Sequence, residues 1–113
     1  MALKRVILEM GMGNDLHGGD YTKAALRAVQ DALHHSSLAF VRSLELDPKK
    51  VQVEVTIGVQ HPEKVDAAAV QKSLPNGEVT VNVVKGGLDV PEEGRHDLAV
   101  IASAALAVRY ELP

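Results

Sequence analysis

The nine residues from 51 to 59 alternate strictly between branched apolar side chains and other residues. Valine or isoleucine stands at every odd position of VQVEVTIGV, and Gln, Glu, Thr and Gly stand between them. A repeat of two residues sends alternate side chains to opposite faces of a β-strand. The segment therefore predicts a strand with one buried face and one polar or mixed face, and any fold of this chain must cover the valine face.

Three further segments complete the predicted sheet. Residues 5–10 alternate weakly and are followed by Gly11 and Gly13, which we expect to end that strand. Residues 78–84 repeat the valine alternation. Residues 98–110 fit a strand or a helix equally well by period, and we assign them to a strand because the sheet needs another member and no helix cap precedes them. The Gly-rich and charged residues 85–96 are interpreted as a loop.

Two segments have a helical period. In residues 20–35 the apolar residues fall on one side of a helix, and Asp20 is placed to cap its first turn. Arg27 and Asp31 are four residues apart, so we expect them to pair on the solvent side. Pro62 suits the first turn of a second helix, residues 62–73. The stripe of the first helix consists of Ala25, Val29, Ala32 and Leu33.

The resulting element order is β-α-β-α-β-β. It predicts an α+β fold, an α/β two-layer arrangement of one mixed sheet with two helices on one face, in a single domain over residues 1–113. The opposite face, with Glu54 and Thr56, has to meet water or another subunit. Residues 36–48 are interpreted as a break followed by an apolar connector that ends at Pro48.

Composition excludes several classes of protein. A net charge of −3 without a basic stripe argues against a nucleic-acid partner. The absence of cysteine excludes disulfides and thiolate chemistry. The longest apolar run, residues 98–108, is about half of what a membrane span needs, so we expect no membrane partner and a cytoplasmic location. Only 3% of residues are aromatic, so the core is made of small side chains and self-association is expected to stabilise it.

The segment GMGNDLHGGDYTKAA, residues 11–25, lies between a predicted strand and a predicted helix. Such turns bind phosphates when backbone N–H groups and the helix dipole are free to do so. The dinucleotide pattern fails here because Leu16 stands where its third glycine belongs. The P-loop pattern fails because Gly19 and Asp20 stand where Lys and Ser or Thr belong. We therefore expect no nucleotide and no other cofactor.

Asp15 and His17 are the candidate catalytic residues of this turn. An imidazole titrates near neutral pH, and a neighbouring carboxylate can orient it for acid–base chemistry. Two other interpretations stay open: with Asp20 and Glu9 these residues have donors suited to a divalent ion, or the aspartates only make turn and capping bonds. No serine lies in a nucleophile pattern.

A second glycine-rich segment follows the strand at 78–84. Gly86 and Gly87 permit close approach of a ligand to the backbone, and Lys85 is able to hold a carboxylate. A bulge or hairpin exit explains the same glycines. If this segment and the first turn lie together, within one subunit or across a boundary, they form one pocket.

Four stretches of the chain resemble a small family of conserved hypothetical proteins, the Lin-type family. They are GMGNDLHGGDYTKAALRAVQDAL, TIGVQHPEKVD, LPNGEVTVNVVKGGLDV and DLAVIASAALAV, and together they span nearly the whole chain. No reaction is assigned to that family. Gly19 departs from its pattern, in which a larger polar residue stands. The residues that match it are Gly11, Gly13, Asp15, His17, Gly18, Asp20, Thr22, Lys23, Gly86 and Gly87.

This family is similar in fold to chorismate-mutase-like and enamine/imine-deaminase-like trimers and to ring-opening amidohydrolases. The similarity implies a homotrimer with ligand clefts between subunits. We therefore expect an enzyme that acts by acid–base chemistry on a polar or carboxylated metabolite, or else a non-catalytic trimeric ligand-binding or scaffold protein. Asp15 and His17 are its expected catalytic residues. The expected ligand-binding residues are Gly11, Gly13, Gly18, Asp20, Thr22, Lys23, Lys85, Gly86 and Gly87.

Overall fold

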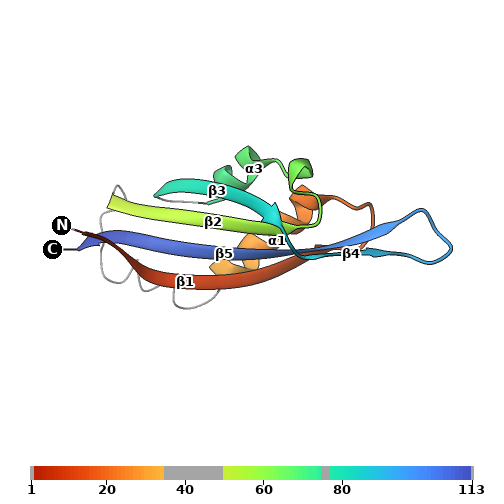
Figure 1. Ribbon diagram of the computed structural model, residues 1–113, viewed down its shortest axis with the longest axis horizontal. Coiled ribbons are helices and arrows are strands. Elements are labelled where there is room, and N and C mark those ends of the chain that lie inside the picture. The colour runs from red at the N-terminus through yellow and green to blue at the C-terminus, as the bar shows by residue number, and fades with distance from the viewer. Residues whose placement is uncertain (1, 35–49, 75–76, 113) are drawn as a thin grey trace.

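The protein is described by a computed structural model that covers residues 2–34, 50–74 and 77–112. It is a mixed sheet with two α-helices on one face, as the sequence predicts (Figure 1). The predicted break and apolar connector at residues 36–48 lie outside the described residues. The elements are β1 (Ala2–Asp15), α1 (Tyr21–Leu33), β2 (Val51–Val59), η3 (Pro62–Lys64), α3 (Ala67–Lys72), β3 (Glu78–Lys85), β4 (Leu88–Pro91) and β5 (Leu98–Leu112).

Strand β5 is the centre of the sheet. The strand order is β1-β5-β2-β3, and β4 also pairs with β5. Strands β1, β2 and β4 run antiparallel to β5, whereas β2 and β3 are parallel. Residues 98–110, whose period fits a helix or a strand, therefore form a strand as predicted. Their backbone pairs with three neighbouring strands, which a helix cannot do.

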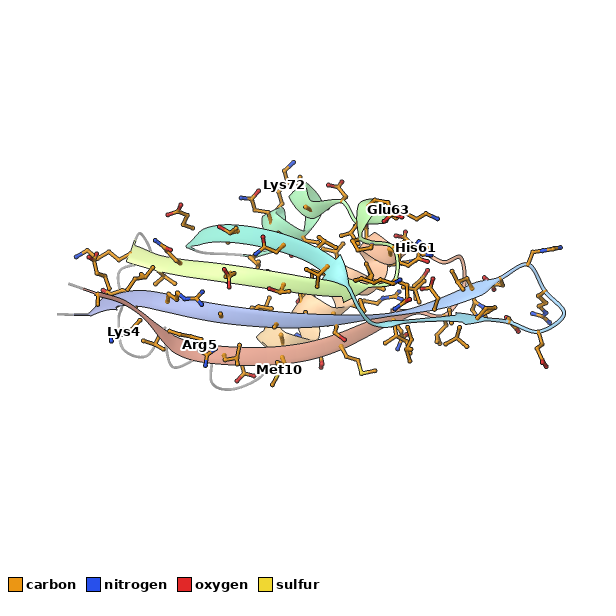
Figure 2. The ribbon with its side chains drawn as sticks, in the orientation of Figure 1. Lys4, Arg5, Met10, His61, Glu63 and Lys72 are labelled. Atoms are coloured by element: carbon orange, nitrogen blue, oxygen red, sulfur yellow. The ribbon has the colours of Figure 1, made fainter. Side chains whose placement is uncertain are left out.

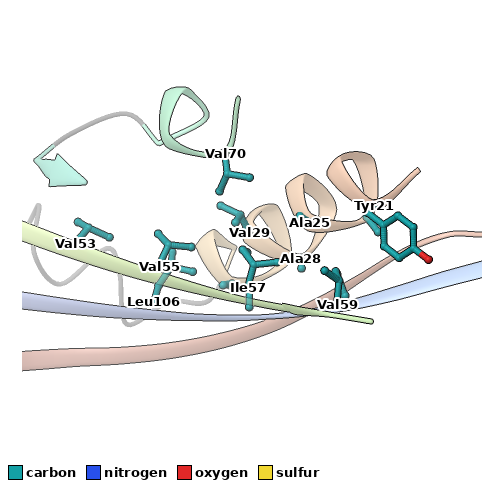
Figure 3. Close-up of a cluster of buried hydrophobic side chains, with 14 of the residues drawn as sticks. Tyr21, Ala25, Ala28, Val29, Val53, Val55, Ile57, Val59, Val70 and Leu106 are labelled. Atoms are coloured by element: carbon teal, nitrogen blue, oxygen red, sulfur yellow. The ribbon is translucent and has the colours of Figure 1, made fainter. Parts of the chain in front are cut away.

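The core lies between α1 and the inner face of the sheet. Figure 3 shows Ala28 and Val29 of α1 above Val55 and Ile57 of β2, and all four side chains are fully buried. Helix α1 begins where the sequence predicts, because the Asp20 carboxylate accepts a hydrogen bond of 3.0 Å from Lys23 N. Such a cap contributes about 1 kcal/mol.

Strand β1 does not end at its glycines, contrary to the sequence prediction. It continues through Gly11 and Gly13 to Asp15, paired with β5 throughout. A Cβ on Gly11 would lie 2.5 Å from Ala28 O, and one on Gly13 would lie 2.6 Å from Ala24 O. The glycines are therefore needed for the close approach of α1 to β1 and not for a turn.

The predicted loop at 85–96 contains a strand. Residues 88–91 form β4, which pairs with residues 98–101 of β5 and makes a hairpin that extends the long axis of the molecule (Figure 1). Gly87, at a φ of 61°, packs on Gly58 and Ile101 and leads the chain from β3 across to β5. The sequence did not predict this short strand, because glycines precede it and charged residues follow Pro91, a composition typical of a loop.

Two other local predictions were wrong. The predicted helix over 62–73 is a 3-10 turn at Pro62–Lys64 followed by a short helix at Ala67–Lys72, which Asp66 caps through Ala69 N. Arg27 and Asp31 do not pair with each other. Arg27 donates to Asn14 O at 2.7 Å, and Asp31 accepts from Met12 N at 2.9 Å, because both side chains reach back to β1.

The face of the sheet opposite α1 carries exposed apolar side chains. Leu8, Met10 and Met12 of β1 point to it, and so do Leu88 and Val90 of β4, each with 41% to 64% of its surface exposed. The β5 residues opposite Met10 and Met12 are Ala105 and Ser103, so a row of small residues runs beside the methionines. None of the helices that the structure describes is long and apolar enough to cross a membrane.

Replacing Gly13 with alanine tests the close packing of α1 on β1. Because the new methyl group would overlap backbone atoms of Ala24 and Ala28, we expect the free energy of unfolding to fall by about 3 kcal/mol. Urea unfolding followed by circular dichroism measures the change. Gly94→Asn is the control, since Gly94 has open space around it and its φ of 75° is one that asparagine tolerates. A loss in Gly13→Ala no larger than in this control would contradict the packing role.

Candidate functional site

The turn between β1 and α1 is fixed to the start of β5. Gly18 and Gly19 have φ values of 96° and 61°, which residues other than glycine rarely adopt. Gly19 N donates to Leu98 O at 3.2 Å. The turn that contains His17 is therefore held against the first residue of β5, beside the loop of the β4–β5 hairpin.

His17 pairs with a carboxylate 80 positions along the chain. Its Nδ1 lies 2.9 Å from Asp97 Oδ2, and Asp97 Oδ1 accepts 2.8 Å hydrogen bonds from Gly18 N and Leu98 N. The carboxylate is thus fixed by two backbone donors and orients the imidazole. The His17 side chain is 73% exposed, so it is open to a ligand.

The two groups shift each other's titration. The hydrogen bond to Asp97 and its negative charge raise the pKa of His17 above 6.5. The hydrogen bond from Gly18 N, followed by the one to His17, lowers the pKa of Asp97 from 3.8 to about 2. Each member favours the charged form of the other, as in an ion pair.

Asp15 lies close to His17 in sequence but faces other partners. It is buried, its Oδ2 accepts a 2.9 Å hydrogen bond from Asp20 N, and its Oδ1 lies 3.5 Å from Arg27 Nη1. These contacts hold the turn onto the start of α1. Asp20 alone caps the helix, and these contacts give the Asp15 carboxylate a structural role of its own.

The other predicted ligand-binding residues are distributed over two regions. Gly11 and Gly13 lie beneath α1, and Thr22 joins α1 to the chain after β2, accepting from Asp66 N at 2.9 Å. Lys23 and Lys85 are exposed. The segment at Gly86 and Gly87 packs on Gly58 of β2, whereas the first turn contacts Leu98 of β5.

A second polar cluster was not found from the sequence. The Tyr21 hydroxyl donates to Asp89 Oδ2 at 2.6 Å, and His61 Nε2 lies 3.5 Å from the same oxygen. The rings of Tyr21 and His61 meet edge to face, 5.6 Å apart. Burial, then the bond to Asp89, raises the pKa of Tyr21 to about 12. The only signal for this cluster was the apolar–Asp–apolar pattern of residues 88–90 within a predicted loop.

Among the residues that the structure describes, one group of side chains has donors suited to a metal ion. The ligand atoms of His17, Glu92 and Asp97 lie within 4.8 Å of one another. One imidazole and two carboxylates suit a divalent transition ion. Only His17 belongs to the set considered from the sequence, in which Asp15, Asp20 and Glu9 were the other donors.

The fold and site define a two-layer α+β protein with a histidine–carboxylate pair at the loop of a hairpin. The model of a family described as conserved hypothetical proteins, Lin0512, matches residues 5–108. The chain therefore belongs to the Lin0512 family, to which no function is assigned. Comparison with curated proteins finds no match.

A solved structure has the same fold over nearly the whole chain. It is that of an FtsZ-like protein of unknown function from Nostoc punctiforme PCC 73102. The two chains are 38% identical, each is covered over 99% of its length, and the TM-score is 0.84. This similarity supports the architecture and supplies no reaction.

The His17–Asp97 pair predicts a specific pH dependence. The pair stabilises the fold fully below the ordinary His pKa of 6.5 and loses this contribution as pH rises through the raised pKa. On the acid side the contribution is present above 3.8 and is lost as pH falls through about 2.

Titration of His17 by NMR measures this shift. In Asp97→Asn we expect the midpoint of the His17 ring signals to fall toward 6.5, because the carboxylate charge is gone. Glu93→Gln removes the same charge from the same loop and is the matched control. Equal midpoints in the wild type and Asp97→Asn would contradict the pairing.

Proposed function

We propose that the protein is a homotrimer that binds a polar or carboxylated small molecule near a subunit boundary and acts on it by acid–base chemistry through His17. The observation that carries this proposal is the exposed His17 imidazole, oriented by an Asp97 carboxylate that two backbone N–H groups fix. An imidazole so held is ready to transfer a proton without reorganising.

The two ring nitrogens of His17 take different roles in this proposal. Nδ1–H donates to Asp97, which sets the tautomer and leaves Nε2 to accept a proton from the bound molecule. The imidazolium that forms is stabilised by the Asp97 charge. Asp15, expected from the sequence to share the acid–base work, holds the turn in place from its buried position.

The anionic part of the ligand needs hydrogen-bond donors or positive charges that are not already bonded within the chain. Gly18 N, Gly19 N and Gly86 N donate inside the chain, to Asp97, Leu98 and Val59 respectively. Lys23 and Lys85 are exposed. We assign the carboxylate of the ligand to one of these lysines rather than to the glycine N–H groups.

The uncovered sheet face supports self-association. A strip as long as β5, 15 residues, and about three strands wide covers on the order of 800 Å². That is about what each partner contributes to a standard interface. On this strip Met10 and Met12 stand beside the small residues Ala105 and Ser103, so a second copy is able to insert its methionines into the row of small residues.

Met10→Glu tests the assembly. A charge at this 64% exposed position would be buried without a partner in the trimer, so we expect trimers to become monomers at micromolar concentration. Sedimentation velocity measures the mass. Lys72→Glu, on the helical side of the sheet, is the control and should stay trimeric; a monomeric wild type at 100 µM, roughly a hundred times a micromolar Kd, would contradict the proposed assembly.

A thermal-shift screen of small carboxylic acids tests the binding function. A ligand at about 100 times its Kd should stabilise the wild type by about 2.7 kcal/mol. His17→Ala should lose most of this stabilisation while keeping the trimer. The melting temperature of the free protein should fall only slightly, because an ion pair with an exposed member contributes little to stability. His96→Ala is the matched control from the hairpin loop.

The same variants separate the two classes of function. Binding that survives in His17→Ala, with no turnover of the ligand by the wild type, would favour the non-catalytic binding or scaffold protein. A trimer that falls apart in His17→Ala would give the turn a structural role only.

A further inference from the structure

The structure pairs two histidines with carboxylates of the same hairpin. Asp97 precedes β5 and faces His17, and Asp89 lies on β4 and faces His61. We propose that His61, positioned by Asp89 and Tyr21, is a second acid–base group. This inference rests on the proposed acid–base function and extends it from one proton-transfer group to two.

Three separate elements build the second group. Tyr21 is the first residue of α1, Asp89 lies on β4, and His61 follows β2. The Tyr21 ring is buried and its hydroxyl is bonded to Asp89 Oδ2 at 2.6 Å, which fixes the carboxylate. His61 is half-exposed, and its ring meets the Tyr21 ring edge to face. It lies close to Glu63 (Figure 2).

The hydrogen bonding of Asp89 is incomplete. Its Oδ1 is buried, and within the described part of the chain it has no hydrogen-bond partner. A buried acceptor without a donor costs stability, so a carboxylate that served only to tie β4 to α1 would be expected to satisfy both oxygens. Such costs are found at functional sites, where the polar group acts on a neighbour. The neighbour here is His61, 3.5 Å from Oδ2.

The chemistry follows from the two ring nitrogens of His61. Nε2–H faces Asp89, which leaves Nδ1 to take a proton from a bound molecule; the imidazolium formed is stabilised by Asp89 and later returns that proton. Nδ1 lies 3.5 Å from Glu63 Oε1, but the Glu63 side chain is 67% exposed and free to move aside. The distance to Asp89 is long for a hydrogen bond, as is common before a ligand tightens a site.

Two imidazoles at one end of a sheet define the class of substrate more closely. Isomerisation or hydrolysis of a small carboxylated molecule needs one proton removed and another delivered. One histidine in the neutral form and one in the charged form supply both transfers. We assign one of the two proton transfers to His17 and the other transfer to His61. Lys64, 5.7 Å from the centre of the Tyr21 ring, adds positive charge beside the second group.

Carbethoxylation by diethyl pyrocarbonate at pH 8 tests the reactivity of His61 without knowledge of the substrate. The reagent is attacked by a neutral imidazole nitrogen, and mass spectrometry of digests gives a rate for each histidine. We expect Asp89→Asn to lower the His61 rate about fivefold, because the carboxylate no longer orients the ring or stabilises its developing charge. Tyr21→Phe, which frees the carboxylate, should give a smaller decrease.

Glu63→Gln is the matched control, since it removes the other carboxylate beside His61. It should leave the His61 rate within about twofold. A His61 rate that is unchanged in Asp89→Asn, or lowered equally by Glu63→Gln, would overturn the proposal. NMR spectra of each variant establish that the fold is retained, and Tyr21→Phe supplies a second route if Asp89→Asn unfolds.

The same digests keep this inference separate from the proposed function. A His17 rate that does not respond to Asp97→Asn, with a His61 rate that does respond to Asp89→Asn, would remove His17 from the proposed function and leave the second group standing. The opposite result would leave a single acid–base group at His17.

Discussion

The contact of α1 with β1 determines most of the structure. Gly11 and Gly13 let the backbone of α1 approach that of β1, and alanines on the helix, Ala24 and Ala28 among them, allow the same from above. Small residues bury little area each, so close approach has to supply the packing that larger side chains would otherwise provide. A single methyl group added to β1 would push the helix away.

The position of α1 in turn sets both histidine–carboxylate pairs. With the helix close to β1, its first residue, Tyr21, reaches Asp89 on β4, and the preceding turn brings His17 to Asp97. The two carboxylates belong to one hairpin, so any movement of that hairpin would change both pairs together. Asp15 supports this arrangement from the buried side by holding Asp20 N and Arg27.

The sequence predicted elements whose cause is local. The alternation of residues 51–59 identified β2, and Asp20 identified the start of α1, because period and capping act over a few residues. Strand β4 was missed because its pairing with β5, and not its composition, makes it a strand. The partner of His17 was missed for the same reason: Asp97 is 80 residues away, and no local pattern reports a contact at that distance.

The shape of the chain joins its assembly to its chemistry. A compact chain of this length has a radius of gyration of about 13 Å, whereas this one has 15.3 Å and extends over 58 Å along its longest axis. The hairpin accounts for much of that length and carries Leu88 and Val90, exposed on the uncovered face, together with Asp89 and Asp97. A second copy that covered those apolar residues would lie on the opposite face of the hairpin from Tyr21 and Asp89, so it would restrict the movement of the hairpin that holds both carboxylates.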